Sequence, residues 1–392
     1  MPSVISSTFL LRTLAALSLL TACMPAPVPG IVQTGAPANP AIKVGKAPHG
    51  MAAAAGFVYN SNSGENTISV IEAATDKLAT TLTLPQGHPS YIKASHDEKF
   101  LFVLSDVGKL YIYAPGQNQA LLQTLDVGKQ PDKLQISPDD HKVWVSLAGE
   151  DDITELDFTQ GFAQAPKQRK LSTGKANPAS EHRALALGLS WLATPNPADN
   201  DLSLINPASG EQLRVRAGNE PEAVALGSWD GQDRMLIIGN KASNTVTLYH
   251  LEAKIAITLQ DVGQTPTDIA VVPELTRAFV SMAGSNELTV IDYRQQKVLK
   301  RIPVGKRPVH VYSTSSRLKI QHGGHDHAEI WVCNDGGETV SVLDAEELTL
   351  KATVPVGKGH HKLAFWSQKA FVSNLSDGTL SVIDRTRLGL QP

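Results

Sequence analysis

A glycine closes a short apolar run at eight places along the chain, and successive glycines lie 41 to 52 residues apart. The eight positions are Gly45, Gly87, Gly128, Gly174, Gly218, Gly263, Gly305 and Gly357. Spacing of this kind indicates an internal repeat, and a repeat of roughly 40–45 residues is typical of a propeller blade. We therefore expect an all-β chain in which each unit supplies one blade of four strands.

Within each unit, apolar or β-branched residues alternate with polar ones. The segments Thr67–Ile71 and Thr379–Ile383 show this alternation clearly. A period of two indicates a half-buried strand rather than a helix. Clusters of Asn, Gly, Asp and Ser, such as residues 61–66 and 240–244, separate these segments and supply the turns of hairpins. The local pattern therefore agrees with the repeat.

The last unit lacks one strand. Only 35 residues follow Gly357, which is enough for three strands before residue 385. A matching outer strand is present at the other end of the chain, where Ala41–Gly45 has the pattern that ends a unit. Pairing this strand with the last three would close the ring and leave no open junction. We predict eight blades, and the alternative is seven, because Leu171–Gly218 is the least regular unit.

The first 22 residues have the pattern of a secretory signal. Arg12 precedes the apolar stretch Leu14–Leu20, which is too short for a membrane span and ends in small residues. The run that ends at Cys23 resembles the lipobox of bacterial lipoproteins, and this resemblance implies that Cys23 is lipidated after cleavage. Ordinary cleavage beside an incidental cysteine is the alternative. Met24 follows the cysteine, and resemblance to Gram-negative lipoproteins then implies sorting to the outer membrane, facing the periplasm.

These observations divide the chain into three parts. Residues 1–22 are predicted to be the lipoprotein signal peptide, and residues 23–40 the lipidated cysteine followed by a tether rich in proline and alanine. Such a composition favours an extended conformation of about 3.1 Å per residue. Residues 41–392 are predicted to form a single propeller domain that the N-terminal lipid anchors to a membrane.

Two short motifs carry a family resemblance. Val58-Tyr59-Asn60 precedes a Thr-Ile-Ser-Val-Ile run, and Phe371-Val372-Ser373-Asn374 precedes a Thr-Leu-Ser-Val-Ile run. With the Pro-Val-Gly segments, they resemble the YVTN-repeat β-propeller family over about residues 41–386. Units 2, 3 and 4 depart from the pattern at residues 104–106, 146–148 and 193–195. The resemblance implies the fold, whereas propellers of this kind serve as scaffolds, ligand binders and cofactor housings.

Histidines gather near the start of the first strand of several units. These residues are His49, His88, His182, His310, His360 and His361. The first strands of a propeller line its central channel, so we expect these side chains at one channel mouth, with Asp132, Glu222 and Asp268 at comparable places in other units. Imidazole and carboxylate ligands suit zinc, and imidazole suits copper, so the pattern predicts a site for Zn or Cu. The alternative is a polar channel lining without metal.

A second histidine cluster lies in an insertion of unit 7. The run from His322 to His327 contains His322, His325 and His327 with Asp326 within six residues. Histidine-rich tracts of this kind bind divalent transition metals. Glycines leave such ligands unorganised, so we predict a loop that captures and hands over ions; a solvated polar loop is the alternative.

Composition excludes several classes of function. The formal net charge is −3 and no run of Lys or Arg could follow a phosphate backbone, so nucleic acid is not an expected partner. With Cys23 lipidated, Cys333 is the only thiol, which excludes an internal disulfide and favours a small core residue. The sequence has no nucleophile elbow, metalloprotease helix motif, P-loop or dinucleotide fingerprint, so we expect no enzyme activity.

The sequence therefore predicts a binding protein whose ligand is a transition metal, with Zn and Cu as the candidates. One alternative is a protein-interaction scaffold that needs no cofactor and binds a protein partner. A second alternative is an oxidoreductase-like propeller that houses a haem or a quinone. The spacing of residues does not choose between these possibilities, because convergence of side chains from different blades depends on the folded ring.

Overall fold

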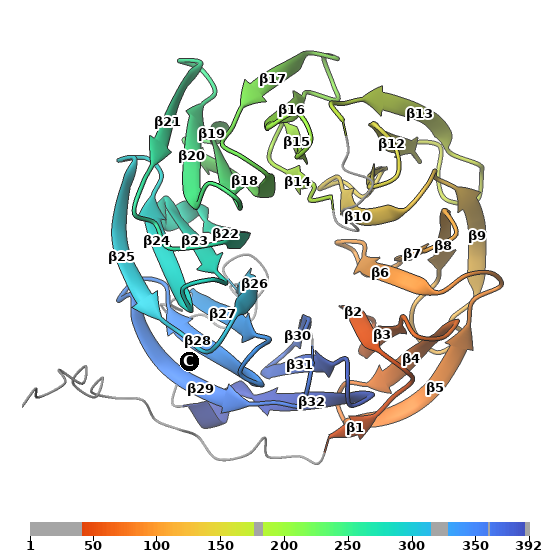
Figure 1. Cartoon of the computed structure of the whole chain (residues 1–392). Helices are drawn as coiled ribbons and strands as arrows, with labels where there is room; N and C mark the ends of the chain where they lie inside the picture. The colour runs from red at the N-terminus through yellow and green to blue at the C-terminus, as the bar shows by residue number, and fades with distance from the viewer. Residues whose placement is uncertain (1–40, 176–182, 315–327, 360, 389–392) are drawn as a thin grey trace, which may run out of the picture. The chain divides into compact units, whose positions relative to one another are not determined.

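Eight antiparallel sheets of four strands each surround a common centre in the computed structural model of the chain (Figure 1). The structure describes residues 41–175, 183–314, 328–359 and 361–388. Cys23, His182, His322, His325, His327 and His360 lie outside these residues. The predicted all-β propeller of eight blades is confirmed, and the seven-bladed alternative is wrong.

Each blade has an inner, a second, a third and an outer strand. The inner strands are β2 (Pro48–Ala54), β6 (Pro89–Ala94), β10 (Pro131–Ile136), β14 (Ala186–Leu187), β18 (Pro221–Trp229), β22 (Pro266–Val272), β26 (Pro308–Ser313) and β30 (Leu363–Trp366). The second strands are β3 (Phe57–Asn62), β7 (Leu101–Ser105), β11 (Lys142–Leu147), β15 (Leu192–Asn196), β19 (Gln232–Asn240), β23 (Arg277–Met282), β27 (Glu329–Asn334) and β31 (Lys369–Asn374).

The other two strands of each blade lie farther from the axis. The third strands are β4 (Thr67–Glu72), β8 (Lys109–Tyr113), β12 (Asp152–Asp157), β16 (Asp201–Ile205), β20 (Thr245–His250), β24 (Glu287–Asp292), β28 (Thr339–Asp344) and β32 (Thr379–Asp384). The outer strands are β5 (Lys77–Thr83), β9 (Leu121–Asp126), β13 (Lys167–Ser172), β17 (Gln212–Arg216), β21 (Ile255–Leu259), β25 (Lys297–Pro303), β29 (Thr349–Pro355) and β1 (Ile42–Lys43). Two short 3-10 helices, Pro273–Leu275 and Arg385–Leu388, complete the described residues.

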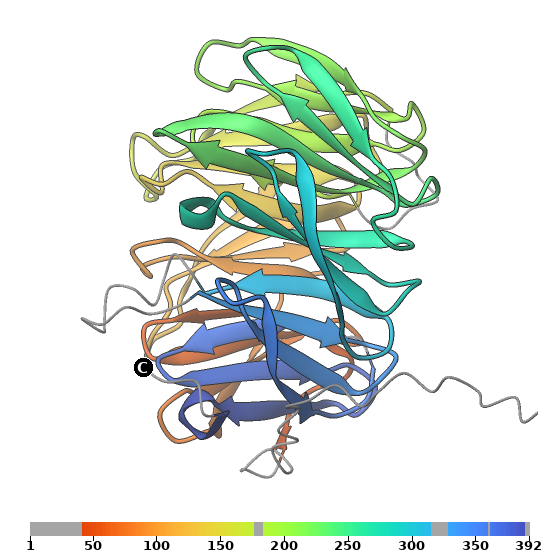
Figure 2. The ribbon, with the colours of Figure 1, turned by 90° about the vertical axis from the view of Figure 1, so that its left-hand side faces the viewer.

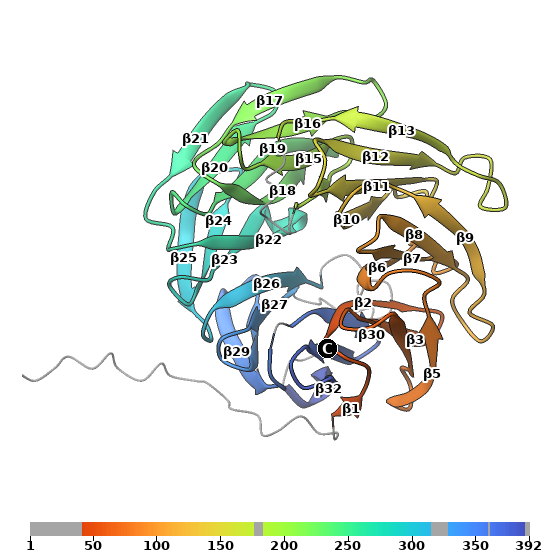
Figure 3. The same ribbon diagram turned by 45° about the vertical axis from the view of Figure 1, so that its right-hand side comes forward.

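The ring closes as the sequence predicts, with the N-terminal strand as the outer strand of the last blade (Figure 3). Ile42 pairs with Leu380 and Lys43 with Thr379, and Ile42 is buried. The closing blade also contacts the first blade, because the Lys369 ammonium lies 2.8 Å from the Asp76 carboxylate. A strand from one end of the chain and three from the other thus make one sheet.

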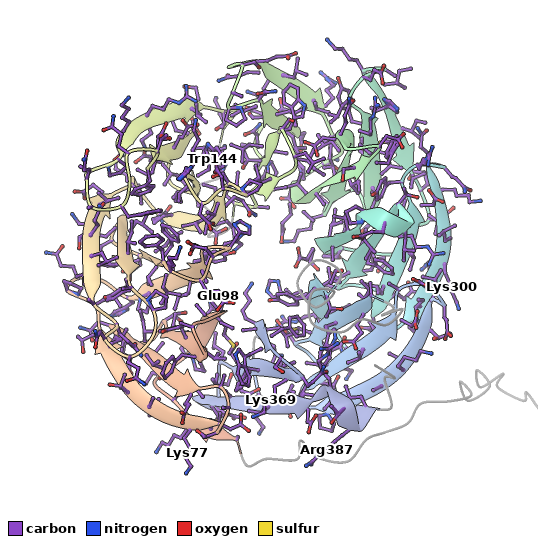
Figure 4. All side chains as sticks on the ribbon, turned by 180° about the vertical axis from the view of Figure 1, so that it is seen from behind. Lys77, Glu98, Trp144, Lys300, Lys369 and Arg387 are labelled. Carbon is purple, nitrogen blue, oxygen red and sulfur yellow. The ribbon has the colours of Figure 1, made fainter. Side chains whose placement is uncertain are left out.

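The hydrophobic core lies between blades. Strands β7 and β27 are buried along their whole length, whereas β5, β9 and β21 are mostly exposed. Neighbouring blades overlap face to face in the side view (Figure 2), and one cluster joins Tyr59 and Ile68 of blade 1 to Val103 and Tyr111 of blade 2. Lys77 and Lys300 lie on outer strands at the rim (Figure 4). No helix among the described residues is long and apolar enough to cross a membrane.

A buried asparagine explains why the repeat ends in glycine. In blade 8, the Asn374 amide donates to Thr379 Oγ1 and Ser381 Oγ, both at 3.0 Å, and its oxygen accepts from the Gly357 N–H at 2.9 Å. A Cβ on Gly357 would lie 2.6 Å from Asn374 Cγ, so only glycine fits. Residues equivalent to Asn374 occur in four other blades: Asn62, Asn196, Asn240 and Asn334.

The other three blades use glycine for a different reason. Ser105, Leu147 and Met282 end the second strand where the other blades have asparagine. The glycines that precede these blades, Gly87, Gly128 and Gly263, have φ values of +71°, +119° and +108°. A positive φ favours glycine because it has no Cβ. Unit 4, which the sequence places among the departing units, keeps its asparagine at Asn196, and unit 6 lacks one.

Candidate functional site

One position of the repeat from each blade lines the central channel. It is the third residue of the inner strand in six blades and the matching residue in the other two: Gly50, Tyr91, Lys133, Ala184, Ala223, Asp268, His310 and Lys362. These eight residues, which we call the channel ring, surround a cavity of about 420 Å³. Three members are glycine or alanine, and the other five carry a phenol, two amines, a carboxyl group and an imidazole.

A backbone irregularity brings these side chains to the channel. In six blades the pairing of the inner strand shifts between the proline and the residues that follow it, as between Pro308 and His310. A β-bulge inserts one unpaired residue and re-aims the side chains around it. The alternation expected of a regular strand therefore does not tell which residue faces the channel.

Three successive blades contribute a chain of polar contacts. His310 Nδ1 lies 3.4 Å from Asp268 Oδ2, and Lys362 Nζ lies 2.8 Å from His310 Nε2. The N–H groups of Ile269 and Val311 donate to the Asp268 carboxylate at 2.9 and 3.2 Å. The carboxylate is thereby held in place, and an imidazole stands between it and an amine. We call Asp268, His310 and Lys362 the channel triad.

The two amines of the channel ring have different surroundings. Lys133 Nζ lies 2.9 Å from Asp132 Oδ1 and 5.3 Å from the centre of the Tyr91 ring. Burial lowers the pKa of Lys133, but Asp132 and Tyr91 outweigh it and the pKa is raised. Burial, followed by the charge of Lys133, lowers the pKa of Lys362 to about 7. At neutral pH, Lys133 is charged and Lys362 exchanges readily between amine and ammonium.

The predicted histidines occupy different places. His310 belongs to the channel triad, and His49 lies on β2 with its Nδ1 3.3 Å from the carbonyl oxygen of Ser90. His88 is half exposed and lies 3.7 Å from Asp106. His361 is fully buried, with Nδ1 3.1 Å from Asp335 Oδ1 and Nε2 2.8 Å from the carbonyl oxygen of Gly357. Both ring nitrogens of His361 thus face acceptors of the protein itself.

The described residues include no group of three or more His, Cys, Asp or Glu side chains arranged to hold a metal ion. His182, His360 and the loop residues His322, His325 and His327 lie outside the described residues. Binding of Zn or Cu by either cluster therefore stays a prediction.

Two other polar or reactive residues, Cys333 and Asp140, have structural roles. Cys333 is buried in the core of blade 7 as a free thiol, as expected, and burial raises its pKa well above the usual range. Asp140 accepts from the N–H groups of His96 at 2.8 Å and Asp97 at 2.9 Å. It therefore joins the turn of blade 3 to that of blade 2.

Sequence reasoning placed Asp268 and His310 near the channel but missed Tyr91, Lys133 and Lys362. A signal was present: Tyr91, Lys133 and His310 each stand two residues after the proline that opens an inner strand. Comparing that position across the units, rather than searching for histidines, would have found most of the channel ring.

The class of protein that this fold defines is the β-propeller of eight four-stranded blades. No model of a known protein family and no curated protein matches the sequence. Solved structures do resemble it. Saccharomyces cerevisiae Sqt1 has a TM-score of 0.69 at 11% identity and covers 90% of this chain and 99% of its own.

Two further structures have similar scores. Sqt1 from Chaetomium thermophilum, bound to the N-terminus of ribosomal protein L10, has a TM-score of 0.70 at 12% identity, covering 88% of this chain and 98% of its own. The dihydro-heme d1 dehydrogenase NirN, in complex with DHE, has a TM-score of 0.63 at 14% identity, covering 93% of this chain and 76% of its own. At these identities the likeness shows the fold alone.

Proposed function

We propose that the chain is a binding propeller that takes a small ligand carrying an anionic group into its central channel. The observation that carries this proposal is the pair of lysines, Lys133 and Lys362, on one cavity of about 420 Å³. Each ammonium disfavours the charge of the other, and an anion beside both would relieve that repulsion. The volume falls in the range of small-molecule sites.

The cavity has the composition of a selective site. Tyr91 and Tyr312 offer apolar ring surface with a polar tip, and Gly50, Ala184 and Ala223 leave room in blades 1, 4 and 5. A few placed polar groups among apolar ones are characteristic of ligand pockets. Asp132 and Asp268, on the same cavity, would repel ligands of high negative charge. A monoanion or a short acid therefore fits better than a polyanion.

Binding can be tested by calorimetric titration of the purified protein with lactate, pyruvate and inorganic phosphate at pH 6.5. We expect saturable binding of at least one probe, weakened about tenfold or more in Lys133→Met and in Lys362→Met, since a hydrogen bond to a charged group contributes about 1.5–3 kcal/mol. Lys77→Met, on the exposed outer strand β5, is the matched control and should bind normally. Equal affinity in all four proteins would contradict the proposal.

A protein-interaction scaffold is the second candidate, and the likeness to a propeller bound to the N-terminus of another protein supports it. Under this proposal, a peptide segment of a partner enters the same channel. Capture of a partner that survives both Lys133→Met and Lys362→Met would place that interface elsewhere on the ring.

The haem- or quinone-housing alternative is tested by the visible absorption spectrum of the protein as purified.

A transition metal is a further candidate ligand, carried by the sequence of residues 322–327 and by the histidines near the channel. Elemental analysis tests metal binding by the loop. It compares the purified wild type with one triple variant that combines His322→Ala, His325→Ala and His327→Ala. Zinc or copper at about one ion per chain that disappears in the triple variant would support it.

The proposed lipid anchor at Cys23 in the outer membrane is tested separately by membrane fractionation of Cys23→Ser.

A further inference from the structure

The channel cavity is lined by apolar side chains as well as by charged groups. Five of these apolar residues are only partly buried, although each belongs to an inner strand: Met51, Leu187, Val224, Val271 and Val309. A small ion bound among the charged groups would leave this apolar surface in contact with water, which is unfavourable. The cavity therefore has room for a part of a ligand that is itself apolar.

The charged and the apolar groups come from different blades. The two amines belong to blade 3, through Lys133, and to blade 8, through Lys362. In blades 4 and 5 the channel ring has alanine, Ala184 and Ala223, whose short side chains leave the cavity open at these blades. Blades 4, 5 and 6 supply four apolar side chains that line the cavity, which we call the apolar wall: Leu187, Val224, Leu226 and Val271.

The apolar wall extends along the inner strands, away from the channel ring. Leu226 follows Ala223 by three residues on β18, and Val271 follows Asp268 by three residues on β22. Pairing is regular over both stretches, so each spans about 10 Å at the usual rise of a strand. A chain of several methylene groups covers this distance, whereas a single methyl group does not.

The charged end of the cavity favours a carboxylate over a phosphate ester. Lys133 Nζ lies 2.9 Å from Asp132 Oδ1, and Asp268 lines the same cavity, so carboxylates of the protein stand near the amines. Like charges placed close together oppose binding, and a doubly charged phosphate group meets more of this repulsion than a carboxylate with one charge. The charged end therefore suits a single carboxylate.

We propose that the channel binds an aliphatic monocarboxylate, a fatty acid of medium length, with its carboxylate toward Lys133 and Lys362 and its chain along the apolar wall. The inference rests on the proposed anion-binding function and names the class of ligand. The amines supply charge-assisted hydrogen bonds to the carboxylate. Each methylene group that reaches the apolar wall removes apolar surface from water on both the ligand and the protein.

A series of acids that differ only in chain length tests this inference on the purified protein. Calorimetric titrations at pH 6.5 use butyrate, hexanoate and octanoate, and octylammonium as a probe with the octyl chain but the opposite charge. We expect the Kd to fall about three- to fourfold for each added methylene group, the gain for burying one such group. Octylammonium should bind at least about tenfold more weakly than octanoate, since it lacks the charge-assisted hydrogen bonds.

Two variants separate the chain from the carboxylate. Val224→Thr combined with Val271→Thr keeps the shape of both side chains, and we expect about tenfold weaker binding of octanoate with little change for butyrate, because only the longer chain covers the new hydroxyl groups. Lys133→Met should instead weaken all three acids by a similar factor. Val107→Thr, at an exposed position between β7 and β8, is the matched control and should bind every acid normally.

The outcomes separate this inference from the proposed function. Saturable binding of all three acids with equal affinity would overturn the role of the chain and leave the anion site standing. Equal affinity for octanoate and octylammonium would overturn the anion site and this inference together, as would the absence of binding by every probe. If circular dichroism shows that the double variant has lost its fold, the chain-length series on the wild type still decides.

Discussion

The inner hairpin of each blade carries two positions that meet different physical constraints. At the end of the second strand, an asparagine is repeated in five blades and makes the same hydrogen bonds to the next strand in each. On the inner strand, the channel-ring position carries a different side chain in most blades. The asparagine ties strands together within the sheet, whereas a channel-ring side chain points into open space. The repeat is therefore more uniform at the asparagine position, which joins strands, than at the channel-ring position, where a ligand could bind.

The largest expected effect tests the asparagine position. Asn374→Ala removes an amide that is fully buried and leaves Thr379, Ser381 and the Gly357 N–H without that partner. Unpaired buried polar groups cost about 1–3 kcal/mol each, so we expect a loss of about 3 kcal/mol or more in the free energy of unfolding. Urea denaturation measures it.

The matched control for that change is Ser105→Ala in blade 2. The Ser105 hydroxyl is buried without a hydrogen-bond partner in the described residues, so its removal should leave the free energy of unfolding unchanged or raise it. A similar loss in Ser105→Ala and Asn374→Ala would break the distinction between the two kinds of blade.

The next effect compares two histidines from neighbouring blades. His361→Ala leaves the buried Asp335 carboxylate without its imidazole partner at 3.1 Å, and we expect a loss of about 2 kcal/mol in stability. His310→Ala opens onto the channel cavity, where water replaces the ring, and we expect a smaller loss. Thermal denaturation of both variants is the measurement. The comparison fails if His310→Ala is the more destabilising change.

A smaller effect concerns the pH dependence of stability. The pKa of Lys362 is about 7 in the folded protein and about 10.4 in an unfolded chain, so the unfolded state binds more protons between these values. The stability of the wild type should therefore rise as pH increases from 7 to 10, relative to Lys362→Met. Below pH 7 the difference between the two proteins should be constant. A pH-independent difference throughout would show that the amine titrates normally.

The smallest effect is expected at His88, which directly precedes β6. His88 is half exposed and lies 3.7 Å from the exposed Asp106, so the pair contributes little. We expect His88→Ala to change the melting temperature by less than the equivalent of about 0.5 kcal/mol and to leave probe binding in the channel unchanged. A clear loss of either property would extend the functional surface from the channel ring to the rim of blade 2.

Much of the fold follows from local chemistry. The glycine repeat, the alternation in segments such as Thr379–Ile383 and the strand at Ala41–Gly45 predict the blades and their closure, because each depends on neighbouring residues alone. The position of Cys333 in the core follows from its place in the apolar run Ile330–Cys333.

The site could be predicted only in part. His310 and Asp268 were expected near the channel, but His361, at the start of the equivalent strand, is turned into the protein, and Lys362 takes the channel position instead. The irregular pairing at the start of the inner strands decides this, and sequence period carries no information on a shift of one residue. The contacts that lead from Asp268 through His310 to Lys362 depend on three consecutive blades.

The closing strand also determines how the ring responds to a pull on the N-terminal segment. β1 is held to β32 by only two residue pairs, Ile42 with Leu380 and Lys43 with Thr379, and by the Val44 N–H to the Gly378 carbonyl oxygen at 3.0 Å. A pull on the chain before residue 41 reaches the propeller through this short pairing before it reaches any other blade. Tension would therefore peel the outer strand of blade 8 while the other seven sheets stay intact. Resistance to a pull from that end is therefore set by the two-residue strand β1, and force spectroscopy from that end would measure it directly.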